Sequence, residues 1–151
     1  MLTQFQFQDQ HDAVDLTDNA ITALANFPLL RRINTVLLAN NHISSISPML
    51  HVSLPNLTSL SLANNNISEL GDLEPLKELR KLKYLNLIGN PVKEKKWYRE
   101  WLVWRLGSLR VLDFQRIRDK VRCNVIVISL ACSFIVVSEG AKNRKSTLHH
   151  T

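Results

Sequence analysis

Aliphatic residues recur along the chain at fixed offsets, in units whose positions one, four, six and eleven are aliphatic and whose position nine is asparagine. The three complete units are Ile33, Val36, Leu38, Asn41 and Ile43; Leu57, Leu60, Leu62, Asn65 and Ile67; and Leu82, Leu85, Leu87, Asn90 and Val92. An earlier unit differs by having His11 at its first position, and a later unit has Ile117 where the asparagine belongs. The asparagines are 22, 24 and 25 residues apart, which predicts a repeat architecture.

Alternation within each unit predicts a short strand with one apolar side. In the second complete unit Leu60 and Leu62 point inward, while Ser59 and Ser61 point outward. One unit cannot bury its own leucines, so the units must stack on one another. A period of 20 to 29 residues with this spacing is the leucine-rich-repeat signature. We therefore predict an α/β leucine-rich-repeat solenoid, with a curved parallel sheet on its concave face, short helices or turns on its convex face and a C-terminal helical cap.

The recurring asparagines lie where the chain leaves each strand. Their side-chain amides can bond the backbone groups that this turn frees. We predict that they form an interior structural ladder of Asn19, Asn41, Asn65 and Asn90.

Residues 93–106 depart from the repeat and predict an amphipathic helix. Trp97, Trp101 and Trp104 recur at helical spacing, and Gly107 can end the helix. We expect the tryptophans to cover the open end of the last repeat. The alternative is that tryptophan beside lysine suits nucleic acid or a membrane surface.

The repeat pattern divides the chain into residues 1–120, the solenoid with its cap, and residues 121–151, a divergent tail that we do not expect to form a packed domain. The first ten residues leave no room for a further N-terminal repeat and show no secretory signal. The apolar run Val125–Val137 is too short to span a membrane. Lys120-Val-Arg is what a splice-donor sequence read straight through would encode, so we expect the tail after Lys120 to be translated from a retained intron. The alternative is a genuine tail that forms a β-strand.

Charge is unevenly distributed along a chain that is 45% apolar and carries a formal net charge of +6. Residues 1–30 contain four aspartates and no lysine or arginine, whereas residues 91–122 contain ten basic and four acidic residues. Such a dipolar chain suggests two partners, or one partner with two faces. The alternative is a solvated surface whose charges happen to segregate.

Candidate catalytic chemistry is sparse. The five histidines lack metal-ligand spacing, and no phosphate loop, dinucleotide-binding glycines or nucleophile elbow is present. Asp12, Asp15 and Asp18 are better explained as a solvated acidic edge than as a metal cluster. The two cysteines are too few for a disulfide framework and favour a reducing, intracellular setting. We predict a noncatalytic protein with no cofactor, metal or small-molecule substrate.

Several segments together carry a family resemblance. They are DAVDLTDNAI (12–21), FPLLRR (27–32), VLLANNHI (36–43), ELGDLEP (69–75), Asn90-Pro-Val92 followed by Lys95-Lys96 and Tyr98-Arg99, and LRVLDFQ (109–115). Over residues 5–120 the chain resembles the A-prime family of the spliceosomal U2 small nuclear ribonucleoprotein, although it begins one repeat late and departs from the family pattern after Arg118.

The resemblance implies a nuclear protein of pre-mRNA splicing that holds the RNA-recognition domain of a B-double-prime-type partner in its concave face and supports binding of U2 RNA. The outward strand positions are then the predicted protein-binding residues: Asp15, Thr17, Thr35, Leu37, Ala39, Ser59, Ser61, Ala63, Tyr84, Asn86 and Ile88. Phosphates of the RNA are expected to contact Lys93, Lys95, Lys96 and Arg99.

Two other functions use the same sequence features. A leucine-rich regulatory or scaffold subunit of a phosphatase, motor or chromatin complex would offer the same concave face to a different partner. A peripheral membrane protein would bind through the basic tryptophan helix and the apolar tail. We expect no membrane association.

Overall fold

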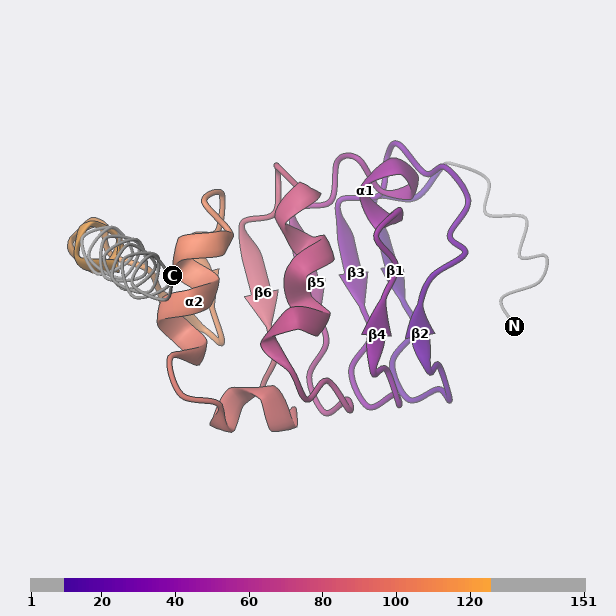
Figure 1. Cartoon of the computed structure of the whole chain (residues 1–151). Helices are drawn as coiled ribbons and strands as arrows, with labels where there is room; N and C mark the ends of the chain where they lie inside the picture. Colours follow the sequence, from indigo (N-terminus) through magenta and orange to yellow (C-terminus); the bar gives the residue numbers. More distant parts are fainter. Residues whose placement is uncertain (1–9, 126–151) are drawn as a thin grey trace, which may run out of the picture. The chain divides into compact units, whose positions relative to one another are not determined.

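The computed structural model describes residues 10–125, which divide between Ile117 and Arg118 into two units. Six strands of the first unit form one sheet, in the order β1 (Ala13–Asp15), β3 (Thr35–Leu37), β5 (Ser59–Ser61), β6 (Tyr84–Asn86), β7 (Val111–Leu112) and β8 (Gln115–Arg116). Within this sheet β1, β3, β5, β6 and β7 are parallel, and β8 returns antiparallel to β7. Equivalent residues are in register, with Val36 between Val14 and Leu60. The predicted leucine-rich-repeat fold is confirmed (Figure 1).

A second layer covers one face of this sheet (Figure 1). It contains β2 (Ala23–Leu24), β4 (Ser45–Ile46), α1 (Leu50–Ser53), the 3₁₀ helices η1 (Leu70–Glu78) and η2 (Pro91–Glu94), and α2 (Tyr98–Arg105). We expected only helices or turns here, but β2 and β4 pair in parallel. The surrounding serines and Pro48 are poor helix formers, which leaves this segment extended.

The core lies between the two layers and consists of aliphatic side chains. The central residue of β3, β5 and β6 is buried in each case, at Val36, Leu60 and Leu85. Each strand therefore presents one apolar residue to the core and leaves its two neighbours on the open face of the sheet.

Asn41, Asn65 and Asn90 are buried and bond successive repeats together. The Asn65 Nδ2 donates to the carbonyls of Leu38 and Leu62, both at 2.9 Å, while its Oδ1 accepts the Ile43 N–H at 3.0 Å. Each such carbonyl serves two asparagines, because Asn41 also donates to Leu38 and Asn90 also donates to Leu62. We call these three residues the inner ladder.

Asn19 was predicted to belong to this ladder, but the structure places it outside the inner ladder. Its side chain is exposed, and its amide donates only within its own turn, to the carbonyls of Leu16 at 2.8 Å and Thr17 at 3.1 Å among the bonds of the described chain. No described repeat precedes Asn19, so nothing in residues 10–18 covers it as one repeat covers the next.

A second polar ladder, which was not predicted from the sequence, runs beside the first. Asp18, Asn40, Asn64 and Gly89 precede the repeat asparagines and all have left-handed backbone, with φ between 54° and 78°. The Asn40 Nδ2 donates to Asp18 Oδ1 at 2.7 Å, and the Asn64 Nδ2 donates to Asn40 Oδ1 at 2.8 Å. This outer ladder ends at Gly89, where an added Cβ would overlap the Asn64 Oδ1. The sequence feature that could have predicted the outer ladder is a residue that tolerates left-handed backbone directly before each repeat asparagine.

Gly89→Ala is expected to lower the free energy of unfolding by about 2 kcal/mol, measured by urea denaturation. About half of this comes from the left-handed backbone and the rest from displacing Asn64. The same substitution in an Asn64→Gly background should cost only about 1 kcal/mol, because no side chain is then displaced. Equal costs in the two backgrounds would contradict the overlap.

The C-terminal cap is confirmed as helical, but its boundaries and its packing face differ from the prediction. The expected helix over 93–106 is interrupted at Trp97, which has left-handed backbone, and α2 begins only at Tyr98. The residues that α2 buries are Tyr98, Leu102 and Val103. Trp97 and Trp104 are 57% and 44% exposed, so the prediction that the tryptophans cover the last repeat is wrong for these two, whereas Trp101 is half-buried.

Asp113 ends the parallel sheet. Its Oδ1 accepts the Leu87 N–H at 2.7 Å, and its Oδ2 accepts the Tyr98 hydroxyl at 2.8 Å. Burial and the neighbouring carboxylate raise the pKa of Tyr98 well above its usual value, so this hydroxyl remains a donor. The cap helix is thereby attached to the strand that closes the sheet.

The cap helix is also attached to η1 by charge. Arg105 donates to both carboxylate oxygens of Glu74, and Lys77 Nζ lies 3.0 Å from Glu74 Oε1. The hydrogen bonds from Arg105 lower the pKa of Glu74 from 4.5 to about 2. A lowered pKa means that this carboxylate stabilises the fold above pH 4.5, and that the contribution disappears as the pH falls toward 2.

Glu74→Gln is therefore expected to flatten the loss of stability between pH 5 and pH 2.5, followed as the urea midpoint. The wild type loses the contribution of Glu74 in this range, whereas the variant has none to lose. Glu94→Gln, at an exposed position of η2, is the charge-matched control. Parallel pH profiles for the wild type and Glu74→Gln would contradict the assignment.

The second unit begins at Arg118 and is described only to Val125. Residues 119–125 are helical, with Cys123 exposed and not disulfide-bonded. The remainder of the predicted divergent tail, including most of the apolar run, lies outside the described residues.

Candidate interaction surface

Seven of the eleven residues predicted to bind a protein lie in β1, β3, β5 and β6, and none of the eleven is buried. The other four, Thr17, Ala39, Ala63 and Ile88, follow the ends of these strands. Leu37 is 36% exposed and Tyr84 is 50% exposed, which is high for large apolar side chains. The strands place both on the open face of the sheet because Leu37 follows the inward Val36 and Tyr84 precedes the inward Leu85.

A hollow of about 320 Å³ lies on this face over β3, β5, β6 and β7. Ser59 and Ser61 of the central strand are small, and they lie in register with Tyr84 and Asn86 of β6. Leu37 is the register partner of Ser61 on the other side. Small residues between larger ones therefore create the hollow, with Val111 completing the lining on β7.

Phe114 is a further member of this surface, and the repeat pattern placed it wrongly. The last unit of the repeat pattern is Leu109, Leu112 and Phe114, so its spacing puts Phe114 at the sixth position, which points inward in the complete units. In the structure Phe114 is 79% exposed and lines the hollow. Asp113 and Phe114 both have left-handed backbone, at φ 50° and 62°, and form the tight turn between β7 and β8. Residue 114 thus lies in the turn and does not follow the inward and outward alternation of a strand. The available signal was the missing asparagine of this unit.

Polar residues at the ends of the strands are held by local bonds. The Asp15 Oδ1 accepts the Thr17 N–H at 2.9 Å, and the Asn86 Oδ1 accepts the Ile88 N–H at 3.1 Å. The bonds from Thr17 lower the pKa of Asp15. The remaining predicted positions, Thr35, Ala39 and Ala63, are half-buried and small, and Thr35 donates to the Asn34 side chain at 2.8 Å.

The four residues predicted to contact RNA lie in and after η2, where the chain has left β6. Lys93, Lys95 and Lys96 are exposed and Arg99 is half-buried. Lys95 Nζ is 2.8 Å from Glu69 Oε1, and Lys96 lies 5.4 Å from the Trp97 ring centre. The Arg99 guanidinium is directed toward the carbonyls of Leu112 and Gln115. Lys95, Lys96 and Arg99 therefore each contact a different group of the chain.

Residues 10–125 contain no group of three histidine, cysteine, aspartate or glutamate side chains placed to hold a metal ion. Within the same range, no helix is long and apolar enough to cross a lipid bilayer.

Comparison with known proteins identifies the family. A leucine-rich-repeat family model matches residues 6–127. The chain is 51% identical over 111 residues to the probable U2 small nuclear ribonucleoprotein A' of Caenorhabditis elegans, covering 74% of the chain and 44% of that relative. It is 53% identical over 115 residues to U2 small nuclear ribonucleoprotein A' of Mycosarcoma maydis, covering 76% and 47% respectively. The chain thus spans about half the length of these relatives.

A solved structure shares the fold over most of the chain. The crystal structure of the Drosophila melanogaster SNF/U2A' complex contains a chain with 45% sequence identity and a TM-score of 0.77, matched over 78% of this chain and 67% of that one. The chain belongs to the leucine-rich-repeat family, within the group of U2 small nuclear ribonucleoprotein A' proteins.

Proposed function

We propose that the chain is a noncatalytic interaction protein of the spliceosomal U2 small nuclear ribonucleoprotein, acting in the nucleus in pre-mRNA splicing. It binds an RNA-recognition-motif partner of the B-double-prime type on the open face and supports binding of U2 RNA by that partner. The family assignment and the similarity to a chain of the SNF/U2A' complex support this proposal.

The observation that carries the proposal is the hollow on the open face. Leu37, Tyr84 and Phe114 are large, exposed apolar side chains that line one depression of small polar residues. Exposed aromatic residues around a shallow depression are typical anchors of protein interfaces, and a helix of the partner fits across such a surface.

RNA contact by Lys93, Lys95, Lys96 and Arg99 remains part of the proposal. Their chemistry suits phosphate oxygens and offers no base-edge readout, so sequence specificity belongs to the partner. The ion pair of Lys95 with Glu69 reduces the charge that this group can offer to RNA.

The test is capture of partners by the purified chain from nuclear extract, read out for the RNA-recognition-motif protein and for U2 RNA. We expect both to be captured, and we expect the protein to be retained after ribonuclease treatment because the protein contact is direct. Capture of a phosphatase, motor or chromatin subunit without the RNA-recognition-motif protein would contradict the proposal. Flotation with anionic liposomes is expected to show no binding.

A further inference from the structure

The parallel strands of the sheet all begin at one edge, and three of the four segments that enter β3, β5, β6 and β7 there are basic, the exception being 56–58 before β5. The segments 31–34, 56–58, 80–83 and 108–110 precede β3, β5, β6 and β7 and contain no acidic residue. They carry six cations, which we call the basic edge: Arg31, Arg32, Arg80, Lys81, Lys83 and Arg110, all exposed. This group was not predicted from the sequence because its members come from segments far apart in the chain.

Hydrogen bonds show that these segments lie side by side. The Arg31 carbonyl accepts from the Asn56 Nδ2 at 2.7 Å, and the Asn56 Oδ1 accepts from the Lys81 Nζ at 2.6 Å. The Arg110 N–H donates to the Lys83 carbonyl at 2.8 Å. Strands are spaced about 4.8 Å apart, so the cations from β3 to β7 extend along about 14 Å of edge.

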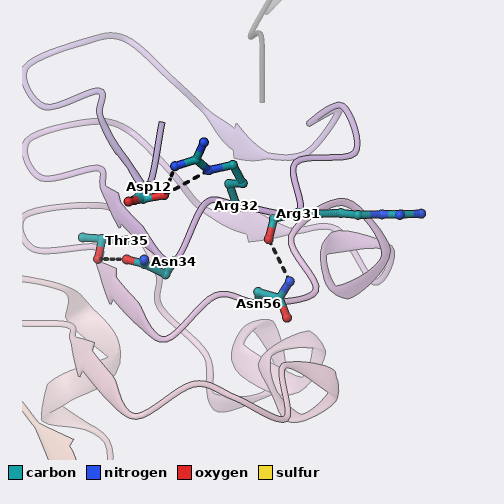
Figure 2. Close-up of polar contacts among 6 residues, drawn as sticks. All are labelled: Asp12, Arg31, Arg32, Asn34, Thr35 and Asn56. Carbon is teal, nitrogen blue, oxygen red and sulfur yellow. Dashed lines mark hydrogen bonds and ion pairs between the residues drawn. The ribbon is translucent and has the colours of Figure 1, made fainter. Parts of the chain in front are cut away.

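One acidic residue lies against the basic edge. Asp12, which precedes β1, forms an exposed ion pair with Arg32 at 3.2 Å (Figure 2). The Arg31 side chain in the same view extends away from Asp12, Asn34 and Asn56. Among the ion pairs of the described residues, the one that involves the basic edge thus lies at its β1 end, and Lys83 and Arg110 are at the far end.

We propose that the basic edge binds the phosphate backbone of an RNA, as a sequence-independent surface distinct from the lysines after η2. A nucleic-acid backbone is a linear array of single negative charges, and cations at the starts of β3, β6 and β7 along one edge of the sheet complement it. The four segments contain no aromatic residue on which a base could stack. The edge is continuous with the open face, since Lys83 and Arg110 immediately precede Tyr84 and Val111, which line the hollow.

This inference rests on the proposed function, because the partner seated in the hollow brings its RNA to that edge. The test uses the full chain, the RNA-recognition-motif partner and an RNA hairpin that the partner binds, with affinity measured over a range of salt concentrations. Two variants each remove three positive charges: Arg31→Gln with Lys83→Gln and Arg110→Gln at the basic edge, and Lys93→Gln with Lys95→Gln and Lys96→Gln after η2.

We expect the basic-edge variant to lower hairpin affinity about tenfold near 0.1 M salt and to reduce the slope of log affinity against log salt by about 2. The η2 variant should have the smaller effect on both. Asp12→Asn leaves Arg32 without this carboxylate and should raise the affinity. The increase in affinity expected for Asp12→Asn tests the inference even if the triple variant fails to fold.

The affinity of the chain for the partner is also measured without RNA. This second measurement tests the proposed function independently of the basic edge. An unchanged salt slope in a basic-edge variant that still binds the partner would overturn the inference and leave the proposed function intact. A larger loss in the η2 variant would also overturn it. Polyglutamate is tested as a competitor at the same charge concentration as the hairpin. If it competes as effectively as the hairpin does, the basic edge is assigned to an acidic protein instead.

Discussion

Asn65→Ala is expected to lower the free energy of unfolding by about 3 kcal/mol, measured by urea denaturation. The substitution removes the acceptor of the buried Ile43 N–H, and no water replaces it in a site that is 3% exposed. The carbonyls of Leu38 and Leu62 each keep one partner, in Asn41 and Asn90. The orphaned N–H and the lost packing therefore account for most of the cost.

Two variants make this prediction specific. Asn19→Ala removes equivalent bonds within its own turn, but at an exposed position, and should cost less than about 0.5 kcal/mol. Asn65→Asp preserves the shape and places a carboxylate against two carbonyls, so at pH 7 it should cost more than alanine. The excess should shrink at acidic pH, because protonation restores a donor. A melting temperature unchanged by Asn65→Ala would refute the inner ladder.

The double variant Leu37→Ala with Tyr84→Ala is expected to weaken partner binding about 100-fold, which corresponds to about 3 kcal/mol. Both side chains line the hollow and are already exposed in the isolated chain, so their truncation removes contacts with the partner while leaving the core intact. Stability should fall by less than about 1 kcal/mol. Binding is measured by calorimetry and folding by thermal denaturation.

Met49→Ala with Val52→Ala is the matched control for this double variant. These residues are 59% and 50% exposed at α1, which belongs to the layer on the other face of the sheet. Their truncation removes a similar amount of exposed apolar surface and should leave partner affinity unchanged. Equal partner affinity in a folded Leu37→Ala, Tyr84→Ala variant would show that the partner does not use the hollow.

The repeat spacing predicted the sheet because strand formation here depends on local alternation. Val36, Leu60 and Leu85 are inward and their neighbours are on the open face, as a period of two requires. The same alternation is enough to place Leu37 and Tyr84 on that face from the sequence alone. These features follow from residues within one repeat and its immediate neighbours.

Features that depend on tertiary contacts or on left-handed backbone could not be predicted in the same way. The apolar spacing of Trp97, Trp101 and Trp104 suggested one helix phase, whereas the chain turns at Trp97 and lets Tyr98 bond Asp113. Phe114 was misplaced because two successive left-handed residues reversed the chain. The basic edge depends on stacking, which places Arg31 and Lys81 on either side of Asn56, each 25 residues from it along the chain.

The β7–β8 hairpin limits how the number of repeats can change. A further parallel repeat after β7 would need the edge that β8 already occupies, where the Ile117 N–H donates to the Arg110 carbonyl. It would also have to replace Asp113 as the acceptor of the Leu87 N–H. A repeat added by duplication or by design must consequently be inserted upstream of Leu109, between existing repeats. A repeat inserted before β3 therefore displaces the hollow and the cap together, whereas one inserted between β3 and β7 divides the hollow.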